Sequence, residues 1–303
     1  MTTHDQQALL KPPPLAKRPW STARIAGHVL VALWAIAFGY LIIYLLGNLE
    51  KPILEFLLPY LSGSWSEYAL RRLETHEFDS FMGRYVKQYI SGFLVTLQIV
   101  SLSLLIGAAL SLPLAMARAS KWKLLSVPAY AYVYFFRGTP LLAQTFLIYY
   151  GFGSFRPELQ SLGLWWFFRD AFYCILFAFA LNTSAYQAEI LRGAVQNISR
   201  GQWEGAAALG LSRPVTFFKV ILPQALMVAL RPYGNEIILM IKGSAIASIV
   251  TIFDLMGETR RAYSRSYDFQ AYIWAAVVYL MMVEVLRRIW DRIELRLTRH
   301  LKR

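Results

Sequence analysis

Charged side chains lie inside one long apolar stretch of the sequence, residues 223–253. The stretch carries Arg231, Glu236 and Lys242, and Asn235 adds an amide. A charge at the centre of a membrane helix costs about 2.5–3.5 kcal/mol unless it faces a cavity or a partner. At about 100° per residue, a helix places Arg231, Asn235 and Lys242 on one polar stripe and turns Glu236 toward a neighbouring helix or subunit. The pattern predicts either a solvated path for a zwitterionic solute or salt bridges between helices.

A second apolar stretch, residues 125–152, is interrupted by Arg137 in "FFRGTPLL". Pro140 follows Thr139, and the residue before a proline disfavours helical geometry. We therefore predict a break in the helix at this point. Arg137 and Thr139 are also candidates for lining the path of the solute.

Residues 201–222 predict a pair of short helices at the membrane surface. The first helix passes through Trp203 and ends at Gly210, because glycine readily adopts the left-handed conformation that terminates helices. Ser212 can cap the second helix, and Pro214 fits its first turn, where no amide donor is missed. The predicted apolar side of the second helix consists of Val215, Phe218, Ile221 and Leu222. On this pattern alone, the segment could equally be an ordinary interfacial linker.

The sequence predicts no catalytic, metal or cofactor site. Its four histidines, His4, His28, His76 and His300, are far apart and lack partners at metal-ligand spacing. There is no G-x-x-x-x-G-K-[ST] phosphate cradle, so the chain cannot bind ATP by that device. With no nucleophile and base arrangement, a membrane enzyme is the least supported class. The single cysteine, Cys174, lies in an apolar stretch, where packing is its expected role.

Composition places the chain in a membrane. Hydrophobic residues make up 57% and charged residues 16%. The charge-free stretches Ile25–Leu49 and Gln88–Ala117 each exceed the roughly 20 residues that cross a bilayer as a helix. The net charge of +13 would suggest a nucleic-acid partner in a soluble protein. Membrane proteins concentrate Lys and Arg in cytoplasmic loops, so we predict no nucleic-acid partner.

We predict an all-α integral membrane protein with about six transmembrane helices. The expected spans are 26–47, 92–117, 125–152, 165–188, 223–253 and 269–286. Residues 1–25 are expected to form a disordered cytoplasmic tail and 291–303 a basic cytoplasmic tail. Residues 48–91 are expected outside the membrane, in the periplasm, with an interfacial piece at 53–61.

The distribution of Lys and Arg predicts the orientation. With six spans, both termini lie on one side, and the segments on that side carry 18 Lys and Arg against 10 on the other. Because basic residues mark the cytoplasmic side, both termini and the helix pair at 201–222 are expected there.

The helix pair resembles a known motif. "EGAAALG" followed by "VILP" is similar to the EAA loop of ABC importer permeases. The residues that match this pattern at its spacing are Glu204, Ala206, Gly210, Leu222 and Pro223. Gly205 stands where alanine is usual, and Val220 where isoleucine is usual. "FRGTPLLAQ" and "LNTSAYQAEILRGA" further resemble the histidine, arginine and opine permeases, and the resemblance covers about residues 90–290.

This resemblance implies a fold and a function. Residues 92–290 would form the five-helix permease domain, and the helix at 26–47 would be an addition to it. The loop would be the coupling helix that docks on a dimer of separate ATPase subunits, with Glu204 near the first turn, where a carboxylate favours the helix dipole. The loop residues implied in coupling are Trp203, Glu204, Gly205, Ala206, Ala207, Gly210, Leu222 and Pro223.

The implied protein is the permease subunit of an ATP-driven importer for polar amino acids or opines in the inner membrane. Its implied partners are the ATPase dimer, a second permease, identical or different, and a periplasmic solute-binding protein. In "NEIILMIKGS", Asn235, Glu236 and Lys242 match the family, but Gly243 stands where aspartate is common, which leaves the substrate open. The alternative function is a self-sufficient channel or ion-coupled carrier, which the intramembrane charges favour, although inverted halves are not detectable.

Overall fold

The computed structural model describes residues 53, 57–60, 62–75 and 81–298, which form helices and connecting turns and no strand. The predicted tail at 1–25 and the predicted helix at 26–47 lie outside the described residues. The chain divides into two compact units, Met1–Gly83 and Arg84–Arg303. The first unit contains the short 3-10 helix η1 (Leu58–Tyr60) and the amphipathic helix α3 (Ser64–Thr75).

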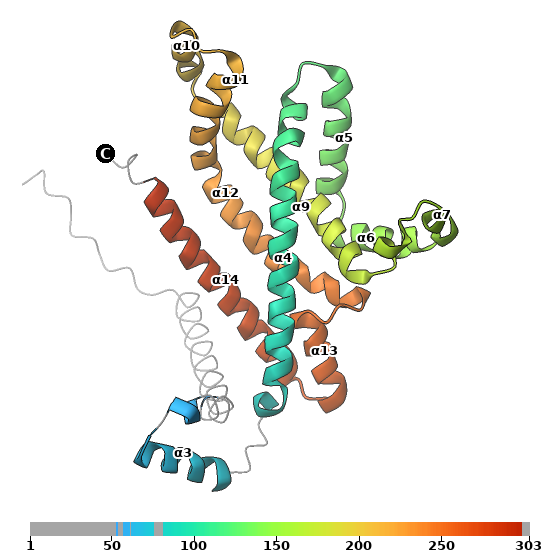
Figure 1. The fold of residues 1–303 in the computed structure, drawn as a ribbon, viewed down its shortest axis with the longest axis vertical. Coiled ribbons are helices and arrows are strands. Elements are labelled where there is room, and N and C mark those ends of the chain that lie inside the picture. The colour runs from blue at the N-terminus through green and yellow to red at the C-terminus, as the bar shows by residue number, and fades with distance from the viewer. Residues whose placement is uncertain (1–52, 54–56, 61, 76–80, 299–303) are drawn as a thin grey trace, which may run out of the picture. The chain divides into compact units, whose positions relative to one another are not determined.

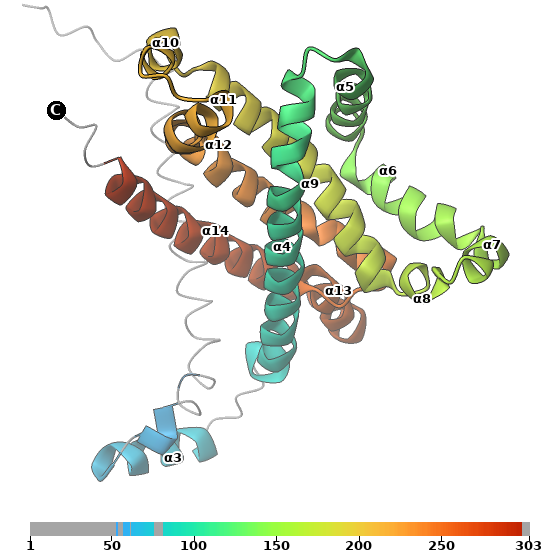
Figure 2. The ribbon, with the colours of Figure 1, turned by 45° about the horizontal axis from the view of Figure 1, so that its top comes forward.

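The second unit is a helical bundle, shown in Figures 1 and 2. Its elements in chain order are α4 (Phe81–Ala119, with its first three residues in the first unit), α5 (Lys123–Gly138), α6 (Leu141–Phe146), the π-helix η2 (Leu147–Gly151), α7 (Arg156–Ser161), α8 (Trp165–Phe168), α9 (Ala171–Gln196), α10 (Arg200–Ala208), α11 (Arg213–Val215), the π-helix η3 (Thr216–Ile221), α12 (Leu222–Gly243), the 3-10 helix η4 (Ser244–Val250), α13 (Leu255–Ser266) and α14 (Gln270–Leu297).

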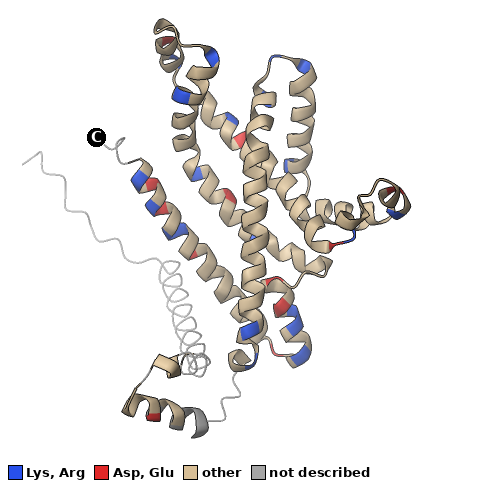
Figure 3. Ribbon diagram, in the orientation of Figure 1, with Lys and Arg blue, Asp and Glu red and all other residues tan. Residues whose placement is uncertain are grey.

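Three continuous helical stretches among the described residues are long and apolar enough to cross a membrane: Phe81–Ala119, Ala171–Gln196 and Arg213–Val250. Helix α4 has 39 residues and is therefore about 58 Å long, roughly twice the thickness of the hydrocarbon layer. It begins eleven residues before the predicted span of 92–117, so the end of the segment predicted to be external is the first part of this helix. The residue colours in Figure 3 place charged residues only near the ends of α4.

The predicted span at 125–152 is broken, as expected. Helix α5 ends at Gly138, Thr139 and Pro140 are extended, and α6 begins at Leu141. The chain then bends away through η2, as both ribbon views show. A proline has no amide hydrogen to continue the helical ladder, which explains why the break falls here.

Helix α9 differs from the predicted span at 165–188. Residues 165–168 form the separate turn α8, and the Asp170 carboxylate caps α9 by accepting a 2.8 Å hydrogen bond from the Phe172 amide. At the other end, α9 runs on to Gln196 through Glu189 and Arg192, two charges at which the predicted span stopped. Both charges are paired within the bundle, so the helix continues through them.

The last two spans are also longer or less regular than predicted. Helix α12 ends at Gly243, and the remainder of the predicted 223–253 span is the tighter helix η4, which ends at Val250. Helix α14 continues past the predicted end at residue 286 into the segment predicted to be a tail. Ion pairs one turn apart, such as Glu284–Arg288 at 2.7 Å, stabilise this charged extension.

Helix α9 lies at the centre of the second unit, packed against α5, α6 and α12. Its inner face carries small side chains, including Ala178, Ser184 and Ala188, all fully buried. Small residues allow helices in membranes to approach closely. A Cβ atom at Gly107 of α4 would lie 2.5 Å from the Thr183 side chain, so only glycine fits against α9 there.

Candidate functional site

The first candidate site is the loop formed by α10, α11 and η3 at one end of the bundle (Figure 2). Helix α10 ends at Gly210, whose φ of 69° is left-handed, as predicted. The Leu211 amide donates to the Ala206 carbonyl at 3.1 Å and the Gly210 amide to the Ala207 carbonyl at 3.0 Å. These two bonds are the Schellman ending of a helix. The turn between the two helices is therefore fixed by backbone geometry.

The second helix of the loop follows the prediction only in part. Ser212 occupies the N-cap position and Pro214 the first turn, but the Ser212 side chain makes no capping bond. The predicted apolar side is divided between two surroundings: Ile221 and Thr216 are buried, whereas Val215 and Phe218 are 38% and 50% exposed. The cause is the π-helix η3, whose wider turn rotates the later residues relative to an α-helix.

Glu204 lies on the outer surface of the loop. It is the fifth residue of α10 and so directly follows the first turn, near which it was predicted. It makes no ion pair or hydrogen bond with any residue that the structure describes. Gly205 and Ala207 beside it are exposed, and Leu209 at the tip is 80% exposed. The loop thus presents a small-residue surface with one free carboxylate and one apolar tip.

The inner side of the loop is anchored to the spans. Ala206 and Ile221 are buried, and Leu222 packs against a buried cluster of α4 and α9 side chains. The side-chain amide of Gln224 in α12 donates a 3.1 Å hydrogen bond to the side-chain oxygen of Gln202 in α10. Pro223 lies in the first turn of α12, as predicted. Contacts to three spans hold the loop as one body with the bundle.

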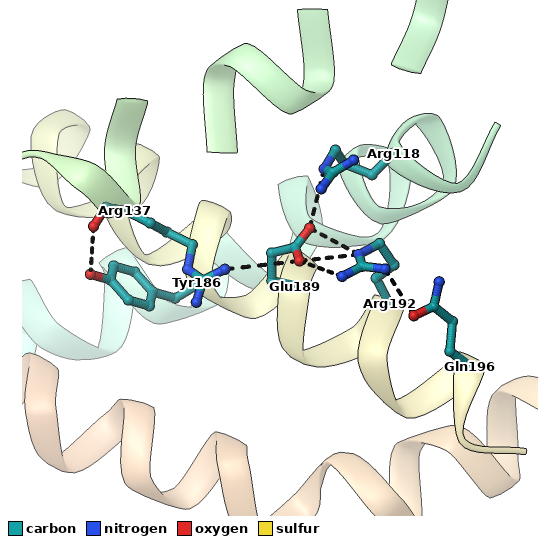
Figure 4. Close-up of polar contacts among 6 residues, drawn as sticks. All are labelled: Arg118, Arg137, Tyr186, Glu189, Arg192 and Gln196. Carbon is teal, nitrogen blue, oxygen red and sulfur yellow. Dashed lines mark hydrogen bonds and ion pairs between the residues drawn. The ribbon is translucent and has the colours of Figure 1, made fainter. Parts of the chain in front are cut away.

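The second candidate site is a charge cluster around Glu189 (Figure 4). Arg192 contacts the Glu189 carboxylate at 2.7 Å, Arg118 of α4 at 3.2 Å, and Arg137 of α5 at 3.8 Å. The Arg137 guanidinium also lies 5.3 Å from the centre of the Tyr186 ring. One carboxylate is therefore surrounded by three guanidinium groups, and the cluster carries an excess of positive charge.

Two cavities meet at this cluster. One, of about 430 Å³, lies between α4 and α5 and is lined by Arg118, Tyr134, Arg137, Thr139 and Glu189, among others. The other, of about 340 Å³, lies between α9 and α12 and is lined by Arg137, Glu189, Asn197 and Pro232, among others. Arg137 and Glu189 line both cavities. The structure thus places Arg137 and Thr139 beside space that a small solute could occupy.

Buried amides stabilise the helix break next to this cluster. In a continuous helix the Phe136 carbonyl would accept from residue 140, but Pro140 has no amide hydrogen. The side-chain amides of Gln144 and Asn182 donate to that carbonyl at 2.9 Å and 3.0 Å instead. Gln144 also donates to the Thr139 carbonyl at 3.0 Å and accepts from Asn182 at 2.9 Å. We call Gln144 and Asn182 the amide clip.

The predicted polar stripe on α12 is divided among different surroundings. Arg231 forms a 2.6 Å ion pair with Glu294 of α14, which is the predicted alternative of a salt bridge between helices. Asn235 lies with Arg231 beside a cavity of about 380 Å³ between α12 and α14. Lys242 is exposed and lines neither this cavity nor the two at Arg137. Glu236 is buried and accepts a 2.9 Å hydrogen bond from Thr183, so it does face a neighbouring helix.

Sequence reasoning missed Glu189 and the amide clip. Glu189 and Arg192 are three residues apart on a helix, a spacing that predicts an ion pair and could have shown that the helix continues through them. The partners Arg118 and Arg137 come from other helices, and the sequence gives no local signal for them. The same holds for Asn182, which lies 46 residues from the carbonyl that it satisfies.

Comparison with known proteins gives one consistent result. Residues 107–299 match the family described as "Binding-protein-dependent transport system inner membrane component". The nopaline transport system permease protein NocM of Agrobacterium fabrum is 44% identical over 64% of this chain and 81% of its own length. The arginine ABC transporter permease protein ArtM of Haemophilus influenzae is 38% identical over 72% of this chain and 93% of its own.

Solved structures agree with this. A chain of an amino acid ABC transporter, crystallised with histidines, is 35% identical and has a TM-score of 0.63 over 71% of this chain and 96% of its own. A chain of the MetNI methionine ABC transporter shares the fold, with a TM-score of 0.55 over 74% of this chain and 99% of its own. Its sequence is 19% identical. The all-α membrane fold and the transporter class are confirmed. The chain belongs to the family of inner membrane components of binding-protein-dependent transport systems.

Proposed function

We propose that this chain is the permease subunit of an ATP-driven importer for a polar amino acid or an opine. The observation that carries the proposal is the loop at 200–221, a rigid helix pair with a free outer surface and an inner side anchored to the spans. A separate ATPase dimer would hold the outer surface around Glu204 and Leu209. Relatives at 38–44% identity that are named as nopaline and arginine permeases support this assignment.

The anchoring explains how the loop would transmit force. Leu222 packs on α4 and α9, and the Gln202–Gln224 bond ties α10 to α12. Packed interiors behave as bodies that move together, so a displacement of α10 would shift these spans instead of being absorbed in the loop. The proposed coupling residues are therefore the buried Ala206 and the partly buried Leu222 on the inner side and Glu204 on the outer side.

The proposed solute path passes the Glu189 cluster. Glu189 is held most closely by Arg192 and Arg118, while Arg137 is the most distant of the three and its side chain is 45% exposed. Arg137 is thus the guanidinium that can turn toward the carboxylate of an amino acid or opine. Thr139 lies beside it. Asn235 and Lys242, exposed on α12, are proposed to face a second permease subunit, because an unpaired charge facing lipid would be costly.

The proposed setting is the inner membrane, with both termini and the loop in the cytoplasm. A solute-binding protein would deliver the substrate from the periplasm. The permease domain at 92–290 would be the working unit, and the segments before it an addition to the core.

The test is Glu204→Ala in the complex with its ATPase, reconstituted in liposomes with the solute-binding protein. We expect substrate-stimulated ATP hydrolysis and uptake to fall together while the complex still assembles. The matched control is Glu158→Ala, which removes an exposed carboxylate from α7 and should leave both activities unchanged. Unchanged assembly, uptake and stimulated hydrolysis in Glu204→Ala would argue against the coupling role. Uphill uptake by the permease without any ATPase would favour the alternative of an ion-coupled carrier.

A further inference from the structure

An apolar groove lies between the loop and helices α4 and α9, distinct from the two cavities at Glu189 but bordered by Arg192 of that cluster. Its volume is about 320 Å³, roughly ten times the ~30 Å³ share of one water molecule in the liquid. Its apolar lining includes Leu112, Met116, Leu191, Val195, Trp203 and Phe217, which come from α4, α9, α10 and η3. We call it the Trp203 groove. Because most of this lining is apolar, an apolar occupant would remove it from water and is therefore favoured.

The groove is open to its surroundings and has polar groups at one margin. Met116 is 48% exposed and Trp203 is 37% exposed, so an occupant can enter from outside the bundle. Arg192 and Gln196 line the same groove and bond to each other at 2.9 Å. The indole N–H of Trp203 has no hydrogen-bond acceptor among the described residues. An occupant with a long apolar part and an acceptor-bearing end fits these features.

The surroundings of the groove are basic. Lys121, Arg200 and Lys219 are exposed, and each lies within three residues of a groove-lining residue. The acids within the same distance are Glu204 and Glu189, and Glu189 is enclosed by arginines. Positive side chains therefore outnumber the free carboxylates. Anionic lipids in the cytoplasmic leaflet attract such side chains.

We infer that the Trp203 groove binds one acyl chain of an anionic phospholipid, with the headgroup held by the neighbouring Lys and Arg side chains. The acyl chain would fill the space between the loop and helices α4 and α9. Lipid bound there would touch Trp203 on the inner side of the loop. This inference does not depend on which solute the protein carries or on whether an ATPase drives it.

The test uses tryptophan fluorescence of the full chain in vesicles containing either phosphatidylglycerol or phosphatidylcholine with brominated acyl chains, which quench indoles on contact. The signal of Trp203 is the difference between the wild type and Trp203→Phe. We expect brominated phosphatidylglycerol to quench this signal at a lower mole fraction than brominated phosphatidylcholine. The control is Trp166→Phe, because Trp166 is 58% exposed on α8 and lies outside the groove, so its signal should respond equally to both lipids.

Two variants separate the acyl-chain site from general contact with lipid. Ala119→Phe fills the groove at an exposed lining position, and we expect it to abolish the preferential quenching of Trp203. Lys121→Gln and Lys219→Gln should each reduce the preference for phosphatidylglycerol, by up to about fivefold for each lost charge near an anionic surface. Equal quenching of Trp203 by both lipids, or quenching that Ala119→Phe leaves unchanged, would overturn the inference.

Discussion

The amide clip gives the sharpest prediction about stability. Gln144 is 1% exposed and donates to the carbonyls of Phe136 and Thr139 at 2.9 Å and 3.0 Å. Gln144→Leu keeps a similar size but removes both donations and a third, to the Thr139 hydroxyl at 2.8 Å. Phe136 retains the bond from Asn182, whereas the Thr139 carbonyl loses its donor and the buried Asn182 amide loses its acceptor on Gln144. A buried polar group without a partner costs about 1–3 kcal/mol, so we expect the free energy of unfolding to fall by roughly that amount.

For a chain of this size, about 1 kcal/mol corresponds to a shift of about 2–4 °C in the melting temperature. Gln144→Leu should therefore lower it by roughly 4–8 °C for a loss near 2 kcal/mol. Cys174, the only cysteine of the chain and 1% exposed, provides the assay, because a thiol-reactive fluorophore labels it only when α9 opens. The control is Gln160→Leu, an exposed glutamine of α7. Equal melting temperatures for the two variants would refute the role of the clip.

Three further predictions concern single positions. Gly210→Ala forces a side chain into a left-handed φ of 69° and should cost about 1–2 kcal/mol, whereas Gly210→Asn should cost less; thermal unfolding of both variants checks this. Gly234→Ala would place a Cβ atom 2.5 Å from the Trp290 ring, and this overpacking should lower the free energy of unfolding by about 1–3 kcal/mol. Adding Trp290→Leu should restore part of the lost stability. Glu189→Gln leaves Arg118, Arg137 and Arg192 without their carboxylate and should lower stability by about 1.5–3 kcal/mol, measured by the same labelling assay, with Glu158→Ala as the unaffected control.

Features set by local chemistry could be predicted from the sequence. The left-handed ending at Gly210 follows from the glycine itself, and the break near Pro140 follows from the missing amide hydrogen. The turn of Glu236 toward a neighbouring helix follows from helical periodicity. Composition and the length of the apolar stretches were enough to predict an all-helical membrane fold.

Features set by distant contacts could not be predicted in the same way. The predicted span ended at residue 188, yet helix α9 continues to Gln196, and arginines from α4 and α5 contact Glu189 within it. The sequence did not indicate the π-helix at 216–221, in which Thr216 and Ile221 are buried while Phe218 is exposed. A salt bridge from Arg231 was one predicted alternative, but its partner Glu294 is 63 residues away and has no local signal in the sequence.

The central claim is that the loop binds a separate ATPase and transmits its movement to the bundle. The most direct test is whether a thiol at the tip of the loop can be labelled from the cytoplasmic side and is protected by the ATPase. Leu209 is 80% exposed, so Leu209→Cys in a Cys174→Ser background gives one reactive thiol at the proposed docking surface. A membrane-impermeant thiol reagent should label it in inside-out vesicles and not in right-side-out vesicles, and added ATPase subunits should block the labelling. Labelling in right-side-out vesicles, or labelling that the ATPase leaves unchanged, would contradict the account.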